Sequence, residues 1–232
     1  MSVQVPLESR ILVIGGAYGS GKSEVTLNLA EALAKTESAV LLADLDFVNP
    51  YFRSREWEGR LADNIKIIST SEGFQQADLP AISAAVAAGI RLGRDPLLID
   101  LGGDPVGAKV LRRFADEPEL QKAQFWVVVN PYRPFTSSPE QISSLVKRLE
   151  EAAGLRVTGL IANPNLLEET RFENIQKGLD PVQKAGEAIG LPVKFLAISY
   201  ELYLEKKDSL EGLAESASLT LFPLKRHLLP PW

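Results

Sequence analysis

The chain has 232 residues, with 25 basic and 30 acidic side chains, a formal net charge of −5, no cysteine and one histidine. The absence of cysteine excludes disulfides, a thiolate nucleophile and cysteine-ligated zinc or iron–sulfur sites. Because the only histidine, His227, is close to the end of the sequence, a serine–histidine triad or a multi-histidine metal site is nearly excluded as well. The acidic balance argues against a general nucleic-acid-binding protein, and none of these counts opposes a globular domain.

The sequence shows no targeting segment. Residues 1–10 lack both a basic start and an apolar stretch of signal-peptide length. The most apolar helix-like run, Pro80–Leu92, is too short to span a bilayer. We therefore expect a cytoplasmic protein.

Short apolar runs of strand type alternate along the chain with segments of helix length. Most of the runs are continuous, which is typical of strands covered on both faces in a parallel sheet. The expected strands are Ile11–Ile14, Val40–Ala43, Ile65–Ile68, Leu97–Ile99, Phe125–Val129, Val157–Ala162 and Val193–Ile198. This order predicts an α/β fold with a doubly wound, mostly parallel sheet, in a single domain over residues 1–232.

Three helices are expected from periodicity and end signals. Apolar residues from Val25 to Leu33 recur on one helical face. Ser138, followed by a proline, predicts a helix start, and Gly154 predicts its end. The run Pro80–Leu92 is apolar on nearly all sides, which favours a buried core helix, with a subunit interface as the alternative.

The most specific pattern in the sequence directly follows the first strand. It reads Gly16-Ala17-Tyr18-Gly19-Ser20-Gly21-Lys22-Ser23, a full match to G-x-x-x-x-G-K-[ST], the Walker A motif. Strand, glycine-rich turn and helix start are the context in which this motif forms a phosphate-binding loop, because backbone N–H groups and the helix dipole then converge on anionic oxygens. The sequence therefore predicts a P-loop NTPase architecture.

Each part of this loop has an expected role. Lys22 reaches the β- and γ-phosphates, Ser23 offers a hydroxyl to Mg²⁺, and Glu24 offers only its backbone N–H to the α-phosphate. The residues expected to contact nucleotide here are Gly16, Tyr18, Gly19, Ser20, Gly21, Lys22, Ser23 and Glu24.

Acids end two of the expected strands. Asp44 and Asp46 follow the second strand, and Asp100 follows the fourth, with Gly103 three residues later. Acids at the carboxyl ends of buried strands lie at the edge where α/β proteins bind ligands. Asp100 is expected to hold Mg²⁺ through water and Gly103 to offer a backbone N–H to the γ-phosphate, although either acid taken alone could simply cap a helix.

The order of phosphate-binding loop, D-x-D strand end and D-x-x-G strand end resembles the ParA/MinD/CobQ–CobB nucleotide-binding family of SIMIBI-class P-loop NTPases, over nearly the whole chain. The resemblance implies that Asp46 orients the attacking water and that Asp44 and Asp100 lie in the Mg²⁺ shell. It also implies that Asn163 lies near adenine and that the base-binding loop includes Ser199 and Tyr200.

The chain departs from the family pattern at several positions. Ala17 stands where many partitioning-type members carry a signature lysine that acts across an ATP-sandwiched dimer, so a homodimer of that kind loses a main support but stays open. Glu24 stands where threonine is common. Metal-linked mechanisms of relatives that use paired cysteines do not carry over.

The base is expected to be adenine. Guanine-specific P-loop proteins read the base with an N/T-K-x-D segment, and neither Asn130–Arg133 nor Asn163–Leu166 has the lysine or the aspartate. The sequence therefore favours ATP over GTP.

Three further features have open interpretations. Arg53 or Arg55 could be an arginine finger, although two solvated surface arginines are the favoured reading, and Arg133 is a candidate anion contact. The tail, residues 218–232, is expected to pack on the domain or on a partner. Membrane attachment is unlikely, because Pro223 and the terminal prolines interrupt any helix.

These observations predict a Mg²⁺-dependent ATPase with Lys22 and Asp46 as catalytic residues. The resemblance implies a regulatory or cargo-handling role with a protein partner or cargo that the sequence does not identify. The alternatives are an ATP-dependent ligase of the dethiobiotin-synthetase or cobyrinic-acid-synthase type, and a nucleotide-gated binding module with negligible hydrolysis.

Overall fold

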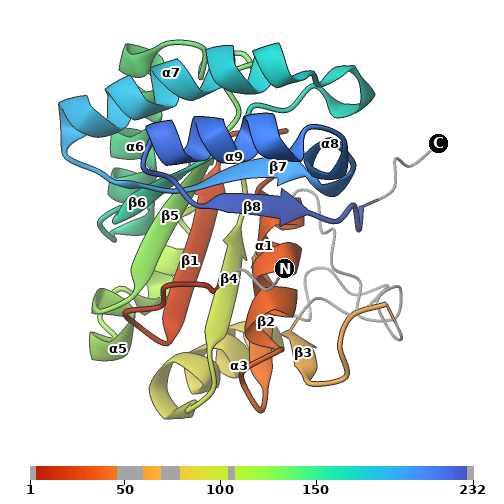
Figure 1. Cartoon of the computed structure of the whole chain (residues 1–232). Coiled ribbons are helices and arrows are strands. Elements are labelled where there is room, and N and C mark those ends of the chain that lie inside the picture. The colour runs from red at the N-terminus through yellow and green to blue at the C-terminus, as the bar shows by residue number, and fades with distance from the viewer. Residues whose placement is uncertain (1–3, 46–59, 69–78, 104–107, 229–232) are drawn as a thin grey trace.

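The structure is a computed structural model that describes residues 4–45, 60–68, 79–103 and 108–228 (Figure 1). Its strands are β1 (Ile11–Gly16), β2 (Val40–Leu45), β3 (Ile65–Ile68), β4 (Leu97–Leu101), β5 (Gln124–Val129), β6 (Gly159–Ala162), β7 (Val193–Ser199) and β8 (Leu221–Leu224). Its α-helices are α1 (Lys22–Leu33), α3 (Leu79–Leu92), α5 (Pro118–Gln121), α6 (Pro139–Ala153), α7 (Phe172–Ile189), α8 (Tyr200–Glu205) and α9 (Lys207–Ser216). Two short 3₁₀ turns, η1 (Leu111–Phe114) and η2 (Leu167–Glu169), complete the described elements.

The described strands form one eight-stranded sheet in the order β3-β2-β4-β1-β5-β6-β7-β8, and every neighbouring pair is parallel. From β1 the chain builds outward through β4, β2 and β3 on one side and through β5 to β8 on the other. The predicted α/β, doubly wound parallel sheet is therefore confirmed. Because all strands point the same way, the loops after them meet at one edge of the sheet.

Helices cover both faces of the sheet, which twists strongly from β4 to β8 (Figure 1). On one face the core contains the buried side of α1, including Val25 and Leu29, packed on residues such as Leu12, Trp126 and Phe195. On the other face it contains apolar residues of α3, α6, α7 and α9. The two layers explain why most strands are continuously apolar.

Local end signals place α6 as expected. The Ser138 hydroxyl accepts a hydrogen bond from the Gln141 N–H at 3.4 Å, so Ser138 caps the helix. Gly154 ends it with φ 69°, in the left-handed region that favours glycine.

One expectation needs correction, and one strand was not expected. The helix over Pro80–Leu92 forms as α3, but among the residues whose side chains are described only one face is buried: Val86 and Ile90 are covered, whereas Ala88 and Leu92 are exposed. A run rich in alanine looks apolar on every side, although its small side chains also suit an outer helix packed on one sheet face. Conversely, β8 is a strand that periodicity did not indicate. It tolerates Pro223 because it lies at the sheet edge.

In the described part of the chain no helix is long and apolar enough to cross a membrane.

Candidate functional site

The phosphate-binding loop leaves β1 and turns directly into α1, which begins at Lys22. Two glycines make this turn possible: Gly19 and Gly21 have φ values of 71° and 87°. Space is restricted as well, since a Cβ on Gly21 would lie 2.4 Å from the Asn163 amide nitrogen. The loop therefore depends on glycine both for its backbone conformation and for its close packing.

Loops from other strand ends hold the phosphate-binding loop in place. Asn163, directly after β6, donates from its amide to the Ser20 carbonyl at 2.8 Å. Arg133, in the loop after β5, donates from Nε to the Gly19 carbonyl at 3.0 Å. Gly103, after β4, lies so close that a Cβ there would be 2.9 Å from the Tyr18 backbone nitrogen. The sheet edge thus supports the loop from several directions.

Asn163 and Arg133 consequently have observed roles as supports of the loop backbone. Asn163 is 3% exposed. Its contact with a base, and the contact of Arg133 with an anion, remain predictions.

An acid meets the Walker A serine within the site. The Ser23 hydroxyl donates to Asp100 Oδ2 at 2.6 Å, and both residues are buried. Asp44 is buried too and stands opposite Asp100 in the register of β2 and β4. Lys22, at the start of α1, is buried as well, with 5% exposure. The structure therefore brings together Lys22, Ser23, Asp44 and Asp100, which the sequence separates by up to 78 positions.

These oxygens fit a Mg²⁺ ion. Mg²⁺ prefers hydroxyl and carboxylate oxygens and keeps several of its ligands as water or phosphate oxygen. Ser23, Asp44 and Asp100 supply such oxygens at the sheet edge, next to the phosphate-binding loop. Within the described residues no group of three or more histidine, cysteine or acidic side chains could hold a metal ion by itself.

Two buried polar atoms at the loop have no hydrogen-bond partner among the described residues: the Ser20 hydroxyl and Oδ1 of Asn163. A buried polar atom without a partner costs about 1–3 kcal/mol. A ligand or water at the loop would remove that cost, and the Ser20 hydroxyl is suited to donate to a phosphate oxygen.

Glu24, the residue after Ser23, turns its carboxylate toward the C-terminal segment. It accepts hydrogen bonds from the backbone N–H of His227 at 2.6 Å and of Leu228 at 3.0 Å. Burial raises the pKa of the Glu24 carboxyl, while these two N–H groups act in the opposite direction and stabilise the carboxylate. The contact expected of Glu24, from its backbone N–H to the α-phosphate, does not involve this carboxylate and stays a prediction.

The other predicted site residues are distributed around the same edge. Ser199 accepts a hydrogen bond from the Leu202 N–H at 3.2 Å and so caps α8, and Tyr200 begins that helix with 40% exposure. Tyr18 is 68% exposed at the loop. Asp46, Arg53 and Arg55 lie outside the described residues.

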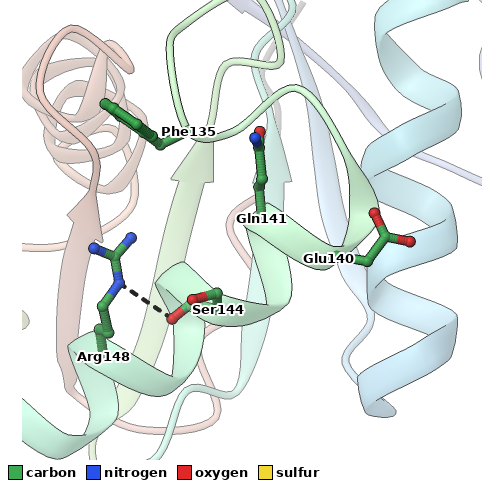
Figure 2. Close-up of a pocket in the computed structure, with 5 residues that line it drawn as sticks. All are labelled: Phe135, Glu140, Gln141, Ser144 and Arg148. Atoms are coloured by element: carbon green, nitrogen blue, oxygen red, sulfur yellow. Dashed lines mark hydrogen bonds between the residues drawn. The ribbon is translucent and has the colours of Figure 1, made fainter.

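A separate hollow of about 380 Å³ lies on the surface beside α6. Figure 2 shows its lining of Phe135, Glu140, Gln141, Ser144 and Arg148. None of these residues belongs to the phosphate-binding loop or to a strand-end acid, so the hollow is not part of the phosphate site.

Sequence reasoning missed the contribution of Asn28 and Lys225. The Lys225 N–H donates to Asn28 Oδ1 at 2.8 Å, and the Asn28 amide donates to the Lys225 carbonyl at 2.9 Å. The sequence offered little signal for this pair, because α1 contains other polar residues and the partner of Asn28 is 197 positions away.

The sequence matches the CobQ/CobB/MinD/ParA nucleotide binding domain over residues 11–202, and the chain belongs to this family. It is therefore a nucleotide-binding domain, as the resemblance implied. No curated protein matches the sequence significantly.

Solved structures with a similar fold include several FtsY proteins. The cell division protein FtsY of Thermotoga maritima has a TM-score of 0.56 and 19% identity, over 84% of this chain and 63% of that one. FtsY of Mycoplasma mycoides has a TM-score of 0.56 and 16% identity, over 82% of this chain and 60% of that one. The signal recognition particle receptor FtsY of Elizabethkingia anophelis, solved in complex with GDP, has a TM-score of 0.51 and 16% identity, over 84% of this chain and 59% of that one. The chain thus spans about three fifths of these proteins, and the likeness shows the fold.

Proposed function

We propose that this chain is a Mg²⁺-dependent ATPase whose bound nucleotide controls a protein partner or cargo. The contact between the Ser23 hydroxyl and Asp100, 2.6 Å long and buried beside the phosphate-binding loop, carries the proposal. In a nucleotide-binding domain this pairing gathers the hydroxyl and carboxylate oxygens suited to a phosphate-bound Mg²⁺.

The residues of the site have different roles in the proposed transfer of the γ-phosphoryl group to water. Backbone N–H groups of the loop and the Lys22 ammonium stabilise negative charge on the transferred group, which is the main contribution a P-loop protein makes. Ser23 and Asp100, with Asp44, would hold Mg²⁺, which when bound neutralises charge on the phosphate oxygens. Asp46 would orient the attacking water.

ATP is the proposed nucleotide because neither candidate base-reading segment has the lysine and aspartate of a guanine reader. The side chain of Asn130 is engaged within the protein: its oxygen accepts a hydrogen bond from the Tyr132 N–H, and its amide donates to the Asn165 carbonyl. The GDP complex of a fold neighbour makes GTP the alternative to test.

Binding and competition test the proposal directly. A fluorescent ATP analogue with Mg²⁺ should bind the unmodified chain, be displaced more strongly by ATP than by GTP, and fail to bind Lys22→Ala. A matched control, Lys35→Ala, removes a lysine just after α1 and should bind as the unmodified chain does. Stronger displacement by GTP would overturn the choice of base, and no binding of either nucleotide would overturn the function.

Asp46→Ala separates binding from hydrolysis. It should retain ATP but release no phosphate, because the water is no longer oriented. The same variant tests the partner role, since it should hold a specific protein in the presence of ATP and Mg²⁺ and release it with ADP. Continued phosphate release would contradict the role of Asp46. Substrate-dependent release of ADP with small carboxylates would instead favour the ligase.

A further inference from the structure

The first turn of α1 carries a carboxylate next to the phosphate-binding serine. Glu24 lies in that turn, directly after Ser23. Its two oxygens are both in use: Oε1 accepts from the His227 N–H at 2.6 Å and from the Asn28 amide at 3.5 Å, and Oε2 accepts from the Leu228 N–H at 3.0 Å. The carboxylate is therefore directed at backbone donors from the far end of the sequence.

A second contact aligns the same segment with α1. One turn after Glu24, Asn28 forms a reciprocal pair of hydrogen bonds with the backbone of Lys225, 2.8 and 2.9 Å long. Residues Lys225–Leu228, which we call the C-terminal strap, follow β8 and so begin at the same sheet edge as the phosphate-binding loop. Asn28 and Glu24 thus hold the strap along the N-terminal half of α1.

The strap contacts α1 and the core through side chains as well: His227 Nε2 lies 3.4 Å from Glu31 Oε2 of α1, and the partly buried Leu228 packs against the core. A hollow of about 620 Å³ adjoins it, lined in part by Asn28, Tyr200 and Lys225. Its remaining described side-chain link to a loop of the sheet edge is an ion pair 2.6 Å long between Arg226 and Glu168 of η2, on exposed side chains. The backbone of the strap is held by its hydrogen bonds to Asn28 and Glu24.

A carboxylate at this position opposes the function of the helix end. The positive end of a helix attracts anions, and a carboxylate in the first turn is drawn to the same N–H groups that must receive phosphates. Placed near a bound phosphate, it would also repel it. The strap offers the carboxylate two other donors that lie away from those N–H groups along α1.

We propose that the C-terminal strap is a positioning element of the nucleotide site: its His227 and Leu228 N–H groups hold the Glu24 carboxylate away from the phosphates, so that strap docking favours nucleotide binding. The inference rests on the proposed nucleotide-binding function and adds a residue pair to it. Nucleotide in turn favours the docked strap, because the coupling of two binding equilibria is reciprocal.

Proline can remove one of the two donors. Leu228→Pro deletes the N–H that reaches Glu24, and Leu228→Ala is the matched control, because it also removes the leucine packing but keeps the N–H. Equilibrium binding of a fluorescent ATP analogue with Mg²⁺ is measured for both variants, each with Glu24 and with Glu24→Gln. We expect Leu228→Pro to bind about tenfold more weakly than Leu228→Ala when Glu24 is present, a difference of about 1.4 kcal/mol. The difference should disappear with Glu24→Gln.

The outcomes separate this inference from the function on which it rests. If the unmodified chain binds ATP but the two Leu228 variants bind equally, the inference is wrong and the proposed function stands. The same holds if the difference persists with Glu24→Gln, because the proline then acts through general loosening and not through the carboxylate. If the unmodified chain binds no nucleotide, both fail.

Asn28→Ala gives a second route that leaves residue 228 intact, in case Leu228→Pro does not fold. It removes both hydrogen bonds of Lys225 to α1 and also the 3.5 Å contact of the Asn28 amide with Glu24 Oε1. Weaker ATP binding that Glu24→Gln restores supports the part of the inference that a released Glu24 carboxylate weakens nucleotide binding, and weaker binding that Glu24→Gln does not restore contradicts it.

Discussion

Two neighbouring residues in the first turn of α1 are held in contrasting ways. Ser23 donates to Asp100, a fully buried acid at the end of β4, 77 positions away. Glu24 accepts from Leu228, 204 positions away, on a strap that is only partly covered. The β4 side of the site is thus built on an inner strand of the sheet, and the strap side on the segment that follows β8.

Asp100 and the C-terminal strap are held in position by different parts of the fold. Asp100 is positioned by β4, which lies between β1 and β2, so its place follows from the sheet itself. The strap lies outside the sheet and is positioned by hydrogen bonds to Glu24 and Asn28 of α1, together with the contacts of His227 and Leu228. We expect substitutions on the β4 side to affect phosphate release most. Substitutions near the strap should affect nucleotide binding or the pKa of a nearby carboxyl.

The largest effect is expected at Asp100. Asp100→Asn keeps the size of the side chain but removes the charge that would hold Mg²⁺, and groups that act on a metal in this way contribute about 10- to 100-fold to metal affinity or activity. Phosphate release should fall by about that factor and require more Mg²⁺. Asp95→Asn, just before β4, is the control and should leave the Mg²⁺ dependence unchanged. An unchanged Mg²⁺ dependence in Asp100→Asn would remove this acid from the metal site.

A smaller effect is expected at Gly21, where the phosphate-binding loop packs against Asn163. Gly21→Ala places a Cβ 2.4 Å from the Asn163 amide nitrogen at a φ of 87°, which should cost about 1–3 kcal/mol of unfolding free energy and weaken ATP binding. Gly212→Ala in α9 is the control, because nothing lies within 4 Å of the added carbon and alanine favours a helix by roughly 0.5–1 kcal/mol. In denaturant unfolding, the free energy of unfolding should therefore fall in Gly21→Ala and rise in Gly212→Ala. Equal stability of Gly21→Ala and the unmodified chain would contradict the described loop conformation.

The smallest effect is expected at the exposed ion pair of the strap. The hydrogen bond from Arg226 lowers the pKa of the Glu168 carboxyl, so Arg226→Ala should raise that pKa toward its ordinary value, as an NMR titration of the carboxyl carbon can measure. Because a lowered carboxyl pKa stabilises the folded chain above the unfolded pKa, this contribution is lost as the pH falls through the folded value. The free energies of unfolding of Arg226→Ala and of the unmodified chain should thus differ slightly near neutral pH and become equal in acid. A Glu168 pKa that does not change would show that the pair is not formed in solution.

Much of the fold was predictable because it depends on local patterns. Every predicted strand forms, and α6 begins and ends at the capping residues that the sequence indicated. The phosphate-binding loop was predictable for the same reason, since its glycines, lysine and serine are consecutive. The exposure of α3 was not, because an alanine-rich run looks alike whether one face or all faces are covered.

Local sequence patterns were enough to predict the parallel α/β sheet, the phosphate-binding loop and the strand-end acids, because strand apolarity, backbone conformation and helix capping depend on neighbouring residues. Tertiary packing was needed to show that Ser23 contacts Asp100, that Asn163 supports the Ser20 carbonyl, and that Glu24 and Asn28 bind the C-terminal strap. These contacts join residues 77 to 203 positions apart. Only the packing of strands and helices brings such residues within hydrogen-bond distance, and the sequence around each residue does not indicate which distant residue it will contact.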